Sequence, residues 1–212
     1  MRVVLASNNT KKLAELQALF AGLPIELVNQ GQLGIGEAEE PHFTFIENGL
    51  AKARHAAAAS GLPALADDSG LCVAALGGAP GVASAHHAPP PPGLAAMTDR
   101  EMRRRAQDAA NNALLQQQLA PHTDRRAAFV CTLVAVRHAR DPEPLVACGR
   151  WAGEILHQPR GEGGFGYDPL MYIAALGASV AELDAALKNC HSHRALAAAA
   201  MRQQLLQSWC RD

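Results

Sequence analysis

Several short groups of residues in this sequence combine polar or charged side chains with turn-forming positions. The first, Ser7-Asn8-Asn9-Thr10-Lys11-Lys12, separates an apolar segment from one with helical spacing. A helix N-terminus leaves backbone N–H groups free and carries a partial positive charge. Small polar side chains there add donors and Lys12 adds a full charge, so the segment could bind phosphate oxygens. An ordinary N-cap explains the same residues, and no GxxxxGK phosphate-loop sequence is present.

A second group, Asp67-Asp68-Ser69-Gly70, follows the apolar segment 62–66. We expect that segment to be a strand that ends at Asp67, and α/β proteins place their ligands where strands end. Adjacent residues of extended backbone point to opposite sides, so one aspartate can face a pocket while the other faces away. The pair could bind a metal ion or act as a base, although a solvated turn is the alternative.

Glu39 and Glu40 form a third group, ahead of a helix that Thr44 and Glu47 should begin as a capping box. Acidic pairs before a helix are common because of the helix dipole alone. Hard Mg²⁺ prefers carboxylate oxygens together with substrate phosphates, so either glutamate could also be a metal partner.

A glycine-rich segment, 161–166, contains Phe165 and is followed by Tyr167, Asp168 and Pro169. Glycines let the backbone approach a flat ligand, and Phe165 or Tyr167 offers a face on which a base could stack. Asp168 could accept hydrogen bonds from the edge of that base. Together these features favour ligand binding over a plain turn.

Lys188 and the run His191-Ser192-His193-Arg194 form the last group, at a helix start. The planar guanidinium of an arginine can donate hydrogen bonds to phosphate oxygens or to a purine carbonyl. Histidines two residues apart do not share a helix face, so a zinc pair is not expected here. Solvated charges around a helix cap are the alternative.

The elements that position these groups alternate between strands and helices. Strands are expected at 2–6, 25–28 and 62–66, and a hairpin at 126–138 and 145–155; helices are expected after residue 10, at 44–60, 98–119 and 193–209. With 49% hydrophobic residues in 212, the chain can bury a sizeable core as one domain, 1–212. This order predicts an α/β fold with a mixed sheet. The segment 86–93, with four prolines, is expected to be a stiff surface loop.

Composition argues against several classes of protein. The formal net charge of -1 disfavours broad binding to nucleic acid or a membrane surface, and Arg103 to Arg105 are most simply a solvated helix face. No apolar stretch approaches the length of a membrane span or a signal peptide. The five cysteines form no CxxC pair and are expected to be buried, reduced thiols. We therefore expect a cytoplasmic protein.

Taken together, the motifs resemble those of the inosine and xanthosine triphosphate pyrophosphatases, a family of enzymes that act on non-standard purine nucleotides. The resemblance covers nearly the whole chain. It is carried, in order, by Ser7-Asn8-Asn9 with Lys12, by 66–71 with 76–81, by 164–169, and by Ser192-His193-Arg194.

The resemblance implies a fold, an activity and a set of roles. The fold is an elongated mixed sheet flanked by helices, with two lobes and a central cleft, usually as a homodimer. The activity is Mg²⁺-dependent hydrolysis of ITP, dITP, XTP and dXTP to the monophosphate and pyrophosphate. Asp68 matches the catalytic acid, and Glu40 with Asp68 matches the metal site, with Glu39 as the alternative to Glu40. The positions matching substrate-binding residues are Ser7, Asn8, Asn9, Thr10, Lys11, Lys12, Ser69, Phe165, Gly166, Tyr167, Asp168, Lys188, His193 and Arg194.

The sequence departs from the family pattern at His86 and His87, where many relatives have an arginine and an aromatic residue, and in the proline run that follows. Two other functions stay open at this stage. One is a Maf-like pyrophosphatase for other modified nucleotides. The other is a nucleotide-binding module without catalytic activity, against which the charged residues Lys12, Asp68 and Lys188 argue.

Overall fold

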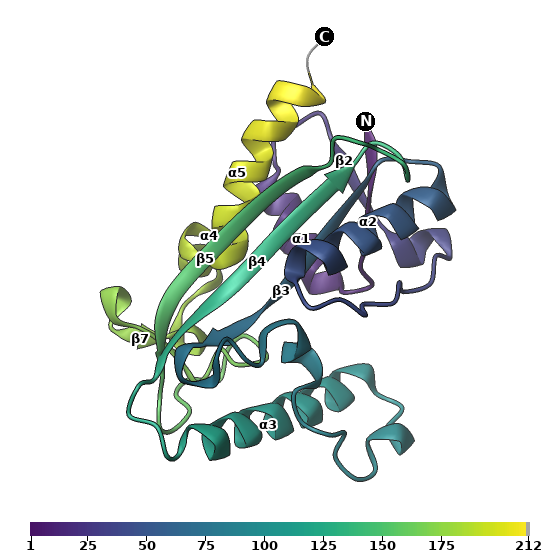
Figure 1. Ribbon diagram of the computed structural model, residues 1–212. Coiled ribbons are helices and arrows are strands. Elements are labelled where there is room, and N and C mark those ends of the chain that lie inside the picture. Colours follow the sequence, from purple (N-terminus) through teal and green to yellow (C-terminus); the bar gives the residue numbers. More distant parts are fainter. Residues whose placement is uncertain (211–212) are drawn as a thin grey trace. The chain divides into compact units, whose positions relative to one another are not determined.

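Seven strands form one mixed sheet in the order β2-β1-β3-β4-β5-β6-β7 in the computed structural model, which describes residues 1–210 (Figure 1). The strands are β1 (Arg2–Leu5), β2 (Glu26–Asn29), β3 (Ala64–Val73), β4 (Arg126–Val136), β5 (Leu145–Ile155), β6 (Met171–Ile173) and β7 (Ala178–Ser179). Strand β1 pairs in parallel with β2 and β3, whereas β6 pairs antiparallel with β5 and β7. The predicted α/β fold with a mixed sheet is therefore confirmed.

The helices begin and end close to where their capping residues predict. They are α1 (Thr10–Leu19), α2 (Phe45–Ser60), α3 (Arg100–Leu119), α4 (Ala185–His191) and α5 (His193–Ser208). Thr44 caps α2 by accepting from the Glu47 N–H, and Gly61 ends that helix in the left-handed conformation, with φ of 67°. Ser192 caps α5 by accepting from the Ala195 N–H.

The chain divides into two compact units. The first comprises 1–69, 131–150 and the C-terminal segment from residue 189. Strands β1 and β4 are apolar and buried on both faces there, because helices cover both. Val3 and Leu5 belong to the core that also contains α1 and α5 residues, whereas Val4 packs with the alanines of α2. This alternation follows from the two-residue period of a strand.

The second unit comprises 70–130 and 151–188. Its core joins Leu115 and Leu119 of α3 to Trp151 and Ile155 of β5 and to Met171 of β6. Helix α3 is therefore the element that holds this unit's loops against its strands. The single domain predicted for residues 1–212 stays a prediction.

Strand β3 corrects the prediction that the strand at 62–66 ends at Asp67. The strand continues to Val73, so both aspartates lie within it. Charged residues normally end a buried strand because burying a lone charge is costly, but here each aspartate meets a cation from a neighbouring helix. The short elements β6, β7 and α4 were not predicted. They are too short to show a hydrophobic period.

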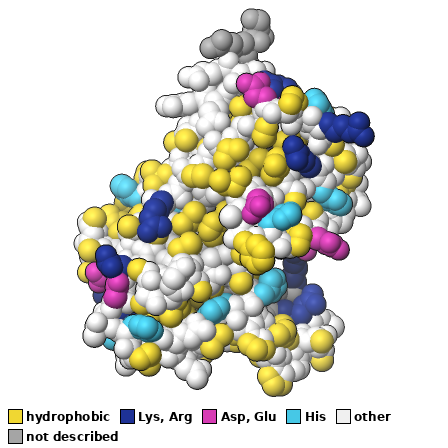
Figure 2. All heavy atoms as spheres, viewed as in Figure 1, with side chains coloured by type: hydrophobic (Ala, Val, Ile, Leu, Met, Phe, Trp, Pro, Cys, Tyr) yellow, Lys and Arg dark blue, Asp and Glu magenta, His cyan; other side chains and the backbone are white. Residues whose placement is uncertain are grey.

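The surface shown in Figure 2 carries lysine and arginine side chains scattered among acidic and apolar ones. Within residues 1–210, no helix is long and apolar enough to cross a membrane. The prediction of buried thiols holds for Cys131 and is wrong for Cys148 and Cys190, which are exposed. Cys148 lies on β5, where the side chains alternate between buried and exposed positions.

Candidate active site

The loop between β1 and α1 is organised by its own side chains. The Asn9 carboxamide oxygen accepts hydrogen bonds from the N–H groups of Lys11 (3.0 Å) and Lys12 (3.2 Å) and so caps α1. The Ser7 hydroxyl accepts from the Asn9 N–H at 3.1 Å. The Asn8 carboxamide nitrogen donates to the Glu37 carboxylate at 3.2 Å. Asn9 is therefore the ordinary N-cap that was given above as the alternative to a phosphate-binding loop. Thr10 and Lys11 are exposed at the start of the helix.

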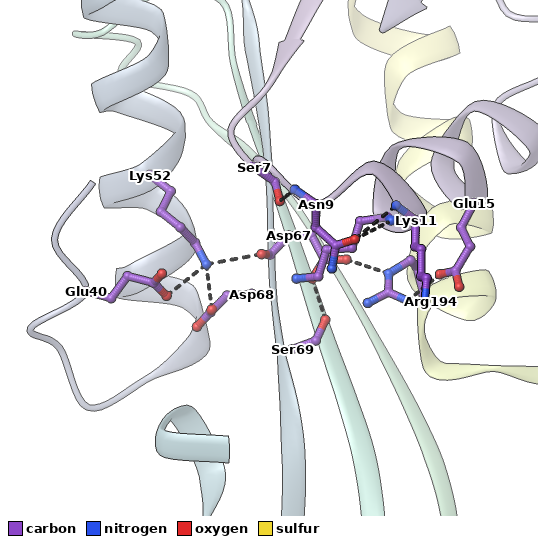
Figure 3. A network of polar contacts seen from close by, with 11 residues as sticks. Ser7, Asn9, Lys11, Glu15, Glu40, Lys52, Asp67, Asp68, Ser69 and Arg194 are labelled. Carbon is purple, nitrogen blue, oxygen red and sulfur yellow. Dashed lines mark hydrogen bonds and ion pairs between the residues drawn. The ribbon is translucent and has the colours of Figure 1, made fainter. Parts of the chain in front are cut away.

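Asp67 lies at the centre of a buried ionic cluster (Figure 3). One of its carboxylate oxygens accepts from the Lys12 ammonium at 3.0 Å and from the Ser69 hydroxyl. The other accepts from Nε of Arg194 at 2.6 Å, and the same guanidinium also pairs with Glu15. Burial acts to raise the pKa of Asp67, but the charges of Arg194 and Lys12 hold that pKa well below its ordinary value. Asp67 is thus ionised and fully partnered.

Arg194 reaches Asp67 because α5 begins directly on β5. A Cβ atom at Gly149 of β5 would lie 2.0 Å from the His193 carbonyl oxygen and 2.6 Å from the Ala197 nitrogen. Only glycine permits so close an approach. Arg194 is 3% exposed, and its guanidinium is paired with Asp67 and Glu15, so its predicted contact with substrate stays a prediction. His193 is also buried, at the first turn of α5.

A second ionic cluster surrounds Lys52, which sequence reasoning missed. The Lys52 ammonium donates to Asp68 at 2.6 Å, to Glu40 at 2.9 Å and to the Asp67 carbonyl oxygen at 3.1 Å. Lys52 lies one turn after Gly49, where a Cβ atom would come within 3.0 Å of Val134, so α2 lies close to the sheet. The buried face of α2 consists largely of glycine and alanine, and a lysine next to such a face is the signal in the sequence that could have revealed Lys52.

The electrostatics of this second cluster differ from those of the first. Burial is the largest effect on Asp68 and raises its pKa to about 6, despite the opposing charge of Lys52. Burial also acts to raise the pKa of Glu40, but Lys52 outweighs it and the pKa is lowered. One oxygen of Asp68, Oδ2, is buried without a hydrogen-bond partner. A carboxylate with a raised pKa and an unused oxygen is suited to accept a proton or bind a cation.

The second unit brings together Phe165, Asp168 and Lys188. Asp168 accepts hydrogen bonds from the Phe165 N–H at 2.9 Å and from the Lys188 ammonium at 2.7 Å, both on Oδ2. Gly164 has φ of 74°, and a Cβ atom there would lie 2.1 Å from this same oxygen. Asp168 therefore fixes the shape of the glycine-rich loop, and its expected role at a base edge stays a prediction.

The two aromatic residues of this loop differ in how deeply they are buried. Tyr167 is buried in the core of the second unit, and its hydroxyl donates to the Ser84 carbonyl oxygen at 2.9 Å. Phe165 is half-buried, and the Lys188 ammonium lies 4.8 Å from its ring centroid. Of the two rings proposed for stacking, only Phe165 is accessible to a ligand.

Comparison with known proteins places these features in a family. Residues 3–204 match the model of the Ham1 family. A dITP/XTP pyrophosphatase from Methylibium petroleiphilum is 66% identical over 99% of both chains. One from Burkholderia pseudomallei is 58% identical over 96% of this chain and 93% of its own.

Solved structures agree with the sequence comparison. A HAM1 protein from Coxiella burnetii is 40% identical, with a TM-score of 0.86 over 98% of this chain and all of its own. A nucleoside-triphosphatase, also named dITP/XTP pyrophosphatase, from Mycobacterium abscessus is 39% identical, with a TM-score of 0.70 over 95% of this chain and 98% of its own. The fold, the motifs and the relatives agree, and the chain belongs to the Ham1 family.

Proposed function

We propose that this protein hydrolyses non-standard purine nucleoside triphosphates, dITP, ITP and XTP, to the monophosphate and pyrophosphate. Relatives at 66% and 58% identity across nearly the whole chain are named dITP/XTP pyrophosphatase. The observation that carries the proposal here is Asp68, a buried carboxylate with its pKa raised to about 6 beside Lys52 and Glu40. An inert nucleotide-binding module has no need of such a group.

Mg²⁺ is part of the proposal, because the donors around Asp68 suit a hard cation. Glu40 and Asp68 already hold one cation, the Lys52 ammonium, and the buried Oδ2 of Asp68 has no hydrogen-bond partner. Among residues 1–210, no three His, Cys, Asp or Glu side chains are grouped to hold a metal ion by themselves. That fits Mg²⁺, which commonly uses one or two carboxylates and takes its other ligands from substrate phosphates and water. Bound there, it would withdraw charge from the phosphates and favour ionisation of water.

The chain's own groups have separate tasks in this proposal. Asp68 orients a water molecule and accepts its proton as the water oxygen bonds to the α-phosphorus, because its raised pKa makes it a better base than an exposed aspartate. The bond from the α-phosphorus to the bridging oxygen breaks in the same step, and pyrophosphate leaves. Lys12 offsets negative charge on the triphosphate. Discrimination against adenine follows from donors that pair with a 6-keto acceptor, and His193 and Arg194 are the predicted donors.

Pyrophosphate release from a panel of triphosphates tests the proposal. The panel contains ITP, dITP, XTP, ATP and GTP, with a methylated nucleotide for the Maf-like alternative. We expect release from the first three and little from ATP and GTP. Asp68→Asn should lower turnover far more than it weakens binding. Normal turnover by that variant, or equal release from ATP, would overturn the assignment.

Two further predictions concern assembly and location. The family resemblance supports a homodimer, and the cytoplasmic location stays a prediction. Light scattering of the purified protein tests the first, and fractionation of cells tests the second. Binding to nucleic acid is not part of the proposal, since the net charge of -1 provides no basic surplus.

A further inference from the structure

Helix α3 presents three polar side chains to the glycine-rich loop. Arg104, Asp108 and Asn112 are spaced four residues apart and therefore lie along one face of the helix. Asp108 accepts a hydrogen bond from the Gly166 N–H at 2.9 Å. Asn112 donates to the carbonyl oxygen of the same residue at 3.0 Å. Both backbone groups of Gly166 are thus held by α3, which fixes the position of the preceding residue, Phe165.

Arg104 completes this row by contacting the Phe165 ring. The central carbon of its guanidinium lies 4.3 Å from the ring centroid, a close cation–π contact. Arg103 to Arg105 were predicted to form a solvated helix face, and that prediction is wrong for Arg104. Its side chain is 26% exposed, whereas that of Arg105 is 79% exposed.

The two cations at the Phe165 ring differ in how firmly they are held. Lys188 is fixed by a 2.7 Å ion pair with the buried Asp168. Nε of Arg104 lies 3.9 Å from Asp108, longer than a hydrogen bond, so the long side chain can shift without breaking one there. A guanidinium is planar and weakly hydrated, and it stacks on flat π-systems. A base that stacks on the Phe165 ring would therefore also contact the Arg104 guanidinium.

We propose that Arg104 and Phe165 form a stacking pair that receives the purine of the substrate, with the base inserted between guanidinium and ring. This inference rests on the proposed function, because it takes the ligand to be a purine nucleotide. In this structure the guanidinium covers the apolar ring. With substrate, it shifts by the thickness of a base and stacks on the outer face. Arg104 then contributes to binding of the base and leaves the chemical step unchanged.

Three substitutions separate stacking from charge and from folding. Arg104→Gln should raise KM for dITP roughly 2- to 30-fold with little change in kcat, as expected for loss of a cation–π and stacking contact. Arg104→Lys keeps the charge but lacks the planar group, so it should recover only part of this loss. Arg105→Gln removes the same charge from the exposed neighbour and should leave KM near that of the wild type.

A ligand without a base completes the test. Inhibition by inorganic tripolyphosphate should be the same for Arg104→Gln and the wild type, because this probe has nothing to stack. Equal weakening of tripolyphosphate would show that Arg104 acts only by its charge, and a lower KM for dITP would show that it competes with the base. Either result overturns the proposal, as does a fall in kcat accompanied by a lower melting temperature. Failure of the proposed function is a separate result, seen as lack of dITP hydrolysis by the wild-type enzyme.

Discussion

Asp67 and Asp68 are adjacent in sequence and in one strand, yet replacing each by asparagine should change stability in opposite directions. Asp67→Asn removes the carboxylate that partners Lys12 and Arg194, and Arg194 is only 3% exposed. Removing one member of a buried ion pair leaves an uncompensated charge and typically costs about 3–5 kcal/mol. For a chain of this length that lowers the melting temperature by roughly 6–20 °C.

Asp68→Asn should leave the stability unchanged or raise it. The pKa of Asp68 rises from 3.8 to about 6 in the folded state, so folding opposes its ionisation. That difference corresponds to about 3 kcal/mol at neutral pH. Asparagine removes this penalty but also removes a negative charge that pairs with Lys52, so the expected gain lies between about 0 and 3 kcal/mol.

Urea unfolding at several pH values measures both effects. Asp67 has a lowered pKa in the folded state, so its contribution is present above about pH 4 and is lost as the pH falls further. Asp68 has a raised pKa, so its penalty is present above about pH 6 and disappears as the pH falls towards 4. The deficit of Asp67→Asn should therefore persist at pH 5, while any advantage of Asp68→Asn shrinks. Equal unfolding free energies for Asp67→Asn and wild type at pH 7 would refute this account of the ion pairs.

Three other predictions follow from the same structure. Lys52→Gln should raise the pKa of Asp68 above about 6, because the charge of Lys52 opposes the effect of burial. Carbon-13 NMR titration of the metal-free protein measures this pKa, and an unchanged value would contradict the prediction. Gly149→Ala should destabilise the protein by about 3 kcal/mol in urea unfolding, because its Cβ would overlap the His193 carbonyl. Gly36→Ala, where nothing lies within 4 Å, is the matched control and should change stability by less than about 0.5 kcal/mol. EDTA should abolish pyrophosphate release and Mg²⁺ restore it, without change in far-UV circular dichroism; activity that survives EDTA would remove the metal from the proposal.

Local signals predicted much of the fold because capping residues act over one helical turn. Thr44, Gly61 and Ser192 cap the helices that their sequence context predicted. The predicted hairpin strands at 126–138 and 145–155 correspond to β4 and β5, which are neighbours in the sheet. The end of β3 was predicted wrongly because two aspartates can continue a buried strand only when distant residues neutralise them. Lys12 and Arg194 lie 55 and 127 residues away from Asp67, and no local rule includes them.

The candidate site was predicted only where a motif is contiguous. Asp68 and the loop from Ser7 to Lys12 are recognisable as strings of residues. Lys52 and Arg104 are single charges within ordinary helices, and their roles depend on which helix face meets the sheet or the loop. A charge run such as Arg103 to Arg105 is usually solvated, so its middle residue could be distinguished only by packing.

The opposite behaviour of the two aspartates follows from the period of β3. Leu65 belongs to the core cluster beneath α1 and α5, so Asp67, two residues on, points to that face and meets Lys12 of α1 and Arg194 of α5. Ala66 belongs to the cluster beneath α2, so Asp68 points there and meets Lys52 of α2 (Figure 3). Two cations surround Asp67 and keep it ionised, while Asp68 shares one cation with Glu40 and retains a raised pKa. One strand thus places a carboxylate held ionised by two cations beside one with a raised pKa, and a shift of register by one residue would exchange their surroundings.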